Sequence, residues 1–190
     1  MTTSQRRVVL AAAILGAAAL MAWAYYLSLV PATHPDHDHG ILNLDAGGRL
    51  LVDQRDGKTR NLVGRPGKVL IVHFFSTGAD GAAAELSDLF QVQESLKADA
   101  GVEFVLVVKE PTFERVDTWL AQNHLVPPVP GSLVLDPAGE TTAKLNCKRP
   151  LETMIFNPEG KLASQARGRF DWAGSALPRI TSARGGETIE

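Results

Sequence analysis

The sequence predicts an α/β fold, in one domain that follows an apolar N-terminal segment. Strand-like and helix-like segments alternate over most of the chain, a pattern typical of α/β proteins. Two strand-like segments, 69–75 and 102–108, are predicted to be buried, and the first is an apolar run apart from His73, as in a central strand that is covered on both faces. Of the 190 residues, about 140 remain for this domain, which is a common domain size.

Four elements are predicted in the first half of the domain. The dipeptide Asp56-Gly57 is typical of a tight hairpin turn, and it lies between short strands at 50–53 and 60–62. The apolar run 69–75 follows as a buried strand. A helix is expected over 82–96, where apolar side chains recur at the helical period.

The second half continues the alternation and ends in a hairpin and a helix. The expected elements are a strand at 102–108, a helix at 112–123, a short helix at 139–145 that follows the segment 131–136, strands at 153–156 and 162–166, and a helix at 172–180. Asn157-Pro158-Glu159-Gly160 is a turn sequence, so the last two strands are expected to pair. Residues 182–190 are expected to form a flexible tail.

Charge and cysteine content narrow the possible functions. The net charge is −2 and no cluster of Lys or Arg stands out, so no basic surface for nucleic acid is expected. Cys147 is the only cysteine in the sequence and cannot form an internal disulfide. We expect it to be a small core residue rather than to pair with another molecule.

The N-terminus has the features of a membrane anchor. Residues 8–30 form an uncharged run of twenty-three residues, long enough to cross a bilayer as a helix. Arg6 and Arg7 precede the run, so residues 1–7 are expected in the cytoplasm and the rest of the chain outside it. The sequence therefore predicts a single-pass protein of the bacterial inner (cytoplasmic) membrane, with its C-terminal domain in the periplasm.

Two alternatives to an uncleaved anchor remain open. Ala22-Trp23-Ala24 has the small-x-small form of a signal-peptidase site, and Gln5-Arg6-Arg7-Val8 weakly resembles a twin-arginine signal. The apolar run continues past Ala24, which favours the anchor. Export of the domain is expected in either case.

A polar linker, residues 31–49, follows the anchor and contains a histidine cluster. His34, His37 and His39 are interleaved with aspartates, at spacings at which a flexible segment can wrap a divalent cation. Copper is favoured by the intrinsic order of affinities, with nickel and zinc behind it. These spacings are less specific than paired Cys and His motifs, so a solvated hinge is the favoured interpretation.

Several motifs resemble those of one protein family. Gly67-Lys-Val-Leu-Ile-Val-His-Phe-Phe75 is similar to a G-K-x-x-x-V-N-F-W strand, 135–139 to a D-P-x-G turn, and 152–160 to x-T-F-L-I-D-x-x-G. These motifs and the predicted order of strands and helices together indicate that residues 50–181 resemble the TlpA/ResA-type membrane-anchored thioredoxins. The resemblance implies a thioredoxin-like fold, with a central mixed sheet flanked by helices, and specifies no activity.

The redox motif of that family is missing. Its C-x-x-C cysteines correspond to Ala79 and Ala82, the preceding tryptophan to Gly78, and the residues between them to Asp80 and Gly81. Thiol-disulfide exchange needs one thiolate to attack and a second thiol to resolve the mixed disulfide. The resemblance therefore implies a scaffold that has lost its oxidoreductase chemistry.

The family also places a cis-proline opposite this loop, at an edge that receives substrate peptides. Without gaps that position is Leu151, and with a one-residue shift it is Pro150. Both alternatives remain open. Together with Gly78, Asp80 and Gly81, these two residues form the candidate protein-binding surface.

His73 and Cys147 are two further candidates. The family places a buried Asp or Asn near position 73, so His73 is favoured as a hydrogen-bonded core residue over a metal ligand or a titrating group approached by Asp80 and Glu85. Cys147 lies beside two cationic residues, whose charges would favour a thiolate. A catalytic role for this thiol is the less favoured interpretation.

Three functions follow from these features. The favoured one is a non-catalytic accessory subunit or assembly factor of an envelope or respiratory membrane complex. The first alternative is a periplasmic copper-binding or chaperone protein that uses the linker histidines; it is similar to the Sco-type relatives of this fold but lacks their cysteine pair. The second alternative is a residual thiol enzyme that uses Cys147.

Overall fold

The computed structural model describes residues 49–62 and 67–185 of the chain. The predicted anchor, the linker histidines and residues 186–190 lie outside these ranges. Within the described residues, no helix combines the length and the apolar character needed to span a bilayer.

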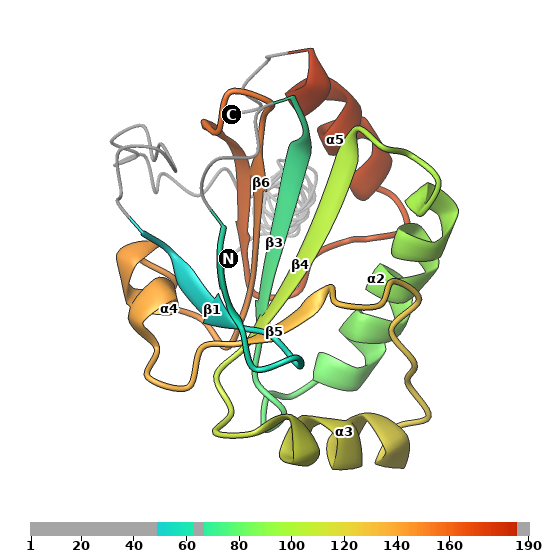
Figure 1. Ribbon diagram of the computed structural model, residues 1–190. Coiled ribbons are helices and arrows are strands. Elements are labelled where there is room, and N and C mark those ends of the chain that lie inside the picture. The colour runs from blue at the N-terminus through green and yellow to red at the C-terminus, as the bar shows by residue number, and fades with distance from the viewer. Residues whose placement is uncertain (1–48, 63–66, 186–190) are drawn as a thin grey trace, which may run out of the picture. The chain divides into compact units, whose positions relative to one another are not determined.

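A seven-stranded sheet forms the centre of the domain, in the order β2-β1-β5-β4-β3-β6-β7 (Figure 1). Its strands are β1 (Leu51–Asp53), β2 (Thr59–Asn61), β3 (Val69–Phe75), β4 (Val102–Val108), β5 (Leu133–Leu135), β6 (Leu151–Phe156) and β7 (Leu162–Arg167). The helices are α2 (Ala82–Leu96), α3 (Phe113–Gln122), α4 (Glu140–Lys144) and α5 (Ala176–Arg184). Because β3 pairs in parallel with β4 and antiparallel with β6, the sheet is mixed, as predicted.

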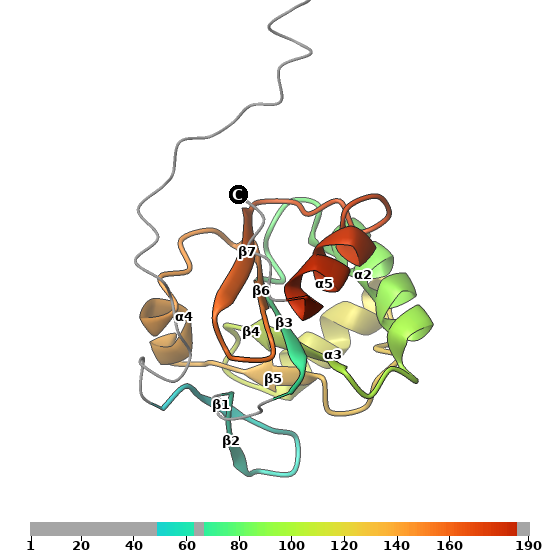
Figure 2. The same ribbon diagram turned by 90° about the horizontal axis from the view of Figure 1, so that it is seen from above.

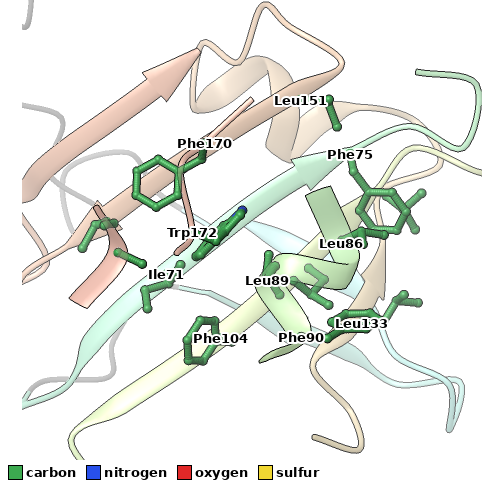
Figure 3. Close-up of a cluster of buried hydrophobic side chains, with 14 of the residues drawn as sticks. Ile71, Phe75, Leu86, Leu89, Phe90, Phe104, Leu133, Leu151, Phe170 and Trp172 are labelled. Carbon is green, nitrogen blue, oxygen red and sulfur yellow. The ribbon is translucent and has the colours of Figure 1, made fainter. Parts of the chain in front are cut away.

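Helices cover both faces of the sheet. α2, α3 and α5 lie on one face, and α4 lies on the other (Figure 2). Every residue of β3 is buried, and its apolar side chains divide between two cores. Ile71 and Phe75 pack with Leu86 and Leu89 of α2 in the larger core (Figure 3), whereas Val72 belongs to the smaller core on the opposite face. A strand buried in this way is expected to be largely apolar, and the sequence of β3 is apolar at every position except His73.

The predicted bounds of β3, β4 and α2 are confirmed to the residue. The predicted start of β6 is wrong by two residues. β6 begins at Leu151 because that residue already pairs with Phe75 at the end of β3.

The predicted start of the last helix is also wrong, since α5 begins at Ala176 rather than at Trp172. The carboxylate of Asp171 accepts hydrogen bonds from the Gly174 amide (2.9 Å) and the Ser175 hydroxyl (3.2 Å). These bonds hold the residues before α5 in a turn. Trp172 is buried, so its apolar character reflects core packing and not a helical position.

Candidate functional site

The loop that corresponds to the redox motif connects β3 to α2, as the resemblance implied. Two consecutive backbone turns shape it. The Ala79 amide donates to the Ser76 carbonyl (3.0 Å), and the Ala82 amide donates to the Ala79 carbonyl (3.1 Å). Gly81 has a φ of 79°, in the left-handed region that favours glycine, and it immediately precedes α2. Backbone hydrogen bonds therefore hold this loop without sulfur.

The side chains of the loop carry no redox chemistry. Ala82 is buried and Ala79 is half-buried, whereas Gly78, Asp80 and Gly81 are exposed. The methyl groups at the two motif positions can neither attack a disulfide nor resolve one. The surface of the loop consists of backbone and the Asp80 carboxylate, so it can make non-covalent contacts.

Pro150 and Leu151 have different places at the edge opposite the loop. Pro150 is exposed and its peptide bond is trans, since no cis peptide bond occurs in the described part of the chain. Leu151 lies beside Phe75 (Figure 3), is 4% exposed, and accepts a hydrogen bond from the Gly168 amide (2.8 Å) at its carbonyl. The expectation that Leu151 belongs to the binding surface is therefore wrong, because its side chain lies in the core.

A buried carboxylate holds the segment that precedes this edge. Glu152 in β6 is fully buried, and its Oε2 accepts hydrogen bonds from the backbone amides of Lys148 (2.9 Å) and Arg149 (3.2 Å). Its Oε1 accepts a hydrogen bond from the Gln165 side chain and lies 3.5 Å from Arg167 Nε. Both oxygens thus have partners, and Glu152 fixes the course of the chain up to Pro150. No sequence signal marked this residue, because β7 supplies two of its partners.

Cys147 lies close to the same carboxylate, and its surroundings disfavour a thiolate. Burial raises the pKa of the Cys147 thiol to about 12, and the negative charge of Glu152 adds to this rise. The side chain packs against the smaller core and donates to the Arg149 carbonyl over 3.5 Å. The expectation that neighbouring cations activate the Cys147 thiol is therefore wrong. Cys147 packs as a small residue against the core.

His73 lies in β3, two residues before its end, and is fully buried. Its Nδ1 is 2.9 Å from the Thr153 hydroxyl oxygen. Its ring stacks on Phe75, with centroids 6.3 Å apart, and meets the ring of Trp172 edge-on at 5.7 Å. Burial lowers the pKa of His73 to about 3, so the imidazole is neutral near pH 7. The prediction of a hydrogen-bonded core histidine is confirmed.

Glu85 is a second buried carboxylate near the loop, and it joins α2 to the segment after β7. Its Oε1 accepts hydrogen bonds from the Phe170 amide (2.9 Å) and from Trp172 Nε1 (3.3 Å). Its Oε2 is buried without a hydrogen-bond partner and lies 3.9 Å from Arg169 Nε. Burial raises the pKa of Glu85. The indole of Trp172 contacts both Glu85 and His73, so it links the two groups.

The side chains of the described part of the domain do not form a metal site. Among residues 49–62 and 67–185, no group of three or more His, Cys, Asp or Glu side chains is placed to hold a metal ion. The linker histidines lie outside these ranges.

No family model matches the chain, and no curated protein matches its sequence. Solved structures do match. A secreted Mycobacterium tuberculosis disulfide oxidoreductase homologous to E. coli DsbE superposes with a TM-score of 0.60 at 13% identity, over 73% of this chain and 98% of its own. StoA from Bacillus subtilis superposes with a TM-score of 0.55 at 20% identity, over 69% of this chain and 94% of its own. The thioredoxin domain of a thiol-disulfide oxidoreductase from Bacteroides vulgatus superposes with a TM-score of 0.56 at 17% identity, over 68% of this chain and 91% of its own.

The fold is thioredoxin-like. Identities of this size establish the fold and leave the activity open. In this thioredoxin-like domain, Ala79 lies in the loop between β3 and α2, Ala82 is the first residue of α2, and backbone hydrogen bonds shape the turn between them.

Proposed function

We propose that this protein acts without redox catalysis, as a membrane-anchored periplasmic accessory subunit or assembly factor of an envelope or respiratory membrane complex. The observation that carries the proposal is the pair Ala79 and Ala82 in a loop that backbone hydrogen bonds keep in a defined conformation. A scaffold that retains a surface but not its reactive atoms is suited to binding, because function depends on the site and not on the fold.

The proposed contact surface consists of Gly78, Asp80, Gly81 and Pro150, all of which are exposed. Two of the four are glycines, whose lack of a side chain lets a partner backbone approach closely. Arg169 borders the surface, since its Cδ lies 3.5 Å from the position that a Cβ on Gly81 would occupy. The surface therefore combines accessible backbone, one carboxylate and one guanidinium group, which suits recognition of a polypeptide.

The anchor is supported by the uncharged run at 8–30 and by the two arginines before it. Full-length protein should remain with membranes after carbonate washing, and its domain should be open to protease added from the periplasmic side. A soluble product that begins at Tyr25 would replace the anchor by a cleaved signal peptide.

A redox assay tests the absence of catalysis. Wild type and Cys147→Ser should both show no dithiol-dependent reduction of insulin above background, because neither carries two thiols. Turnover by wild type that is lost in Cys147→Ser would instead support a thiol enzyme that uses this residue. Equal turnover by both would have to come from another protein in the preparation, because Cys147→Ser contains no thiol.

Site-specific photo-crosslinking in membranes tests the contact surface. A crosslinking residue at position 80 should give one discrete adduct with a membrane protein, and Asp80→Arg should abolish co-purification of that same protein. Val126, which is 80% exposed and lies after α3, is the control position. A crosslinking residue at position 126 is the control for the first experiment, and Val126→Arg is the control for the second. Equal crosslinking at 80 and 126, or unchanged co-purification with Asp80→Arg, would reject the loop as the contact surface.

A further inference from the structure

Three stretches of chain meet around the proposed contact surface, namely residues 76–81, 147–151 and 167–169. Leu151 pairs with Phe75, the last residue of β3, so the second stretch lies beside the start of the loop. The Gly168 amide donates to the Leu151 carbonyl (2.8 Å), which brings the third stretch next to the second. Arg169 borders Gly81, so the third stretch also reaches the end of the loop.

The charges in these three stretches are mostly positive. They contain four cationic side chains and one carboxylate, namely Lys148, Arg149, Arg167 and Arg169 against Asp80. The whole chain, in contrast, has a net charge of −2. The local sequence shows no such cluster, because the two pairs of cations become neighbours only when β6 pairs with β7.

Lys148 and Arg149 present cationic side chains that have no acidic partner in the domain. Both residues are exposed. Glu152 binds them only through their backbone amides, which leaves the ammonium and guanidinium groups outside its hydrogen bonds. Within residues 49–62 and 67–185, no carboxylate forms an ion pair with either side chain. A carboxylate of another molecule can therefore approach both without breaking an existing pair.

The other two arginines are paired to different extents with buried carboxylates. Arg167 Nε lies 3.5 Å from Glu152 Oε1, and the Arg167 side chain is 26% exposed. Arg169 Nε lies 3.9 Å from Glu85 Oε2, and the Arg169 side chain is 63% exposed. Arg169 thus combines a long ion pair with an accessible guanidinium group, so it can add a contact to a ligand at Lys148 and Arg149.

We propose that Lys148, Arg149 and Arg169 form a basic patch that selects an acidic polypeptide segment of the partner, with at least two Asp or Glu side chains close together. The inference rests on the proposed role of the loop and names the chemistry of its partner. The planar guanidinium groups of two arginines match carboxylates in a bidentate way.

The single carboxylate beside the patch favours a polypeptide over a membrane surface. An anionic lipid surface would bring like charge towards Asp80, which is exposed. A polypeptide can place its acidic side chains at the patch and a backbone N–H group at Asp80.

Fluorescence anisotropy tests the proposal on full-length protein in nanodiscs of neutral phosphatidylcholine. The probe is a fluorescein-labelled peptide of sequence Gly-Asp-Glu-Asp-Glu-Gly, and its neutral counterpart has Asn and Gln in place of Asp and Glu. The acidic peptide should bind saturably with a dissociation constant below about 1 mM. The neutral peptide should bind at least about fivefold more weakly, because it forms no ion pairs.

Two double variants show whether the patch or the overall charge is responsible. Lys148→Gln with Arg149→Gln should weaken binding of the acidic peptide by about fivefold or more, because it removes two unpaired charges. Lys58→Gln with Lys161→Gln removes the same charge from exposed positions elsewhere, and should change binding by less than about twofold because distant surface charges are screened. Equal weakening by the two double variants, or equal binding of the two peptides, would overturn the proposal.

Two further measurements separate the alternatives. With half of the lipid replaced by anionic phosphatidylglycerol, the affinity for the acidic peptide should fall by less than about threefold; a larger fall would assign the patch to lipid headgroups and reject the proposal. Crosslinking at position 80 distinguishes this inference from the proposed function. A discrete adduct together with a failed peptide titration would reject the acidic segment and leave the accessory role standing, whereas peptide binding without an adduct would keep the acidic specificity and reject the loop as the contact surface.

Discussion

The buried histidine makes the stability of this domain depend on pH by an amount that can be calculated. His73 is fully buried and its pKa is lowered to about 3, whereas a histidine in the unfolded chain titrates near about 6.5. As the pH falls, the unfolded state therefore binds the proton first. The stability that depends on neutral His73 is complete above about pH 6.5 and is lost as the pH falls towards 3.

The size of the loss follows from these two pKa values. For one proton, the free energy of unfolding falls by about 1.4 kcal/mol for each pH unit between them. From pH 7 to pH 4.5 the loss is about 2.5 kcal/mol. Glu85 acts in the opposite direction: burial raises its pKa, so its ionised form costs stability, and that cost disappears as the pH falls. A variant that alters His73 alone separates the two effects.

His73→Asn removes the titrating ring and keeps a hydrogen-bonding amide beside Thr153. Between pH 7 and pH 4.5, the free energy of unfolding in urea should fall by about 2.5 kcal/mol more for wild type than for this variant. His124→Asn, at an exposed position, is the control and should follow the wild-type profile. Parallel profiles for wild type and His73→Asn would refute the reasoning, because His73 would then take up no proton on unfolding in this range.

Three further predictions concern the loop and the groups around it. In a Cys147→Ser background, Ala79→Cys with Ala82→Cys should form an intramolecular disulfide under mild oxidant, because the backbone bond between the two residues brings their Cα atoms within disulfide reach; thiols that stay free in a folded variant would contradict this geometry. Cys147 should react with iodoacetamide at pH 8 more than about a hundredfold more slowly than free cysteine, because its thiolate is scarce; similar rates would contradict its burial. Glu152→Ala should lower the free energy of unfolding by about 3 kcal/mol, because it leaves buried donors unpaired, and Glu152→Gln should lose less because it keeps an acceptor; equal losses would show that the oxygens do not matter.

The elements that were predictable from the sequence are those whose pattern is local. β3 and β4 are covered on both faces and are apolar at every position except His73 and Glu103, and α2 shows its buried face at the helical period. The start of α5 was not predictable, because Trp172 fits a helical pattern but is held by Glu85, 87 positions earlier in the chain. A contact across that separation leaves no trace in the local sequence.

The loop and His73 could be located from the sequence, whereas the polar groups around them could not. Flanking motifs placed Ala79 and Ala82 between a strand and a helix, and the apolar neighbours of His73 indicated its burial. Glu152 gains its partners only when β6 pairs with β7. Gln93 lies in a helix where a polar residue is ordinary, and only the structure shows that its amide is buried without a partner.

The absence of the two sulfur atoms changes what an encounter at the loop can achieve. In an oxidoreductase, the lifetime of the complex is set by a mixed disulfide that a second thiol resolves. In this chain the loop is ordered by hydrogen bonds that the Ala79 and Ala82 amides donate, and the Glu85 carboxylate accepts a further hydrogen bond from the Phe170 amide. A partner that binds at this loop, as we propose, would be held by non-covalent contacts, and the lifetime of the complex would depend on its dissociation rate. Such a complex would differ from that of an oxidoreductase because no reaction at the loop would release the partner.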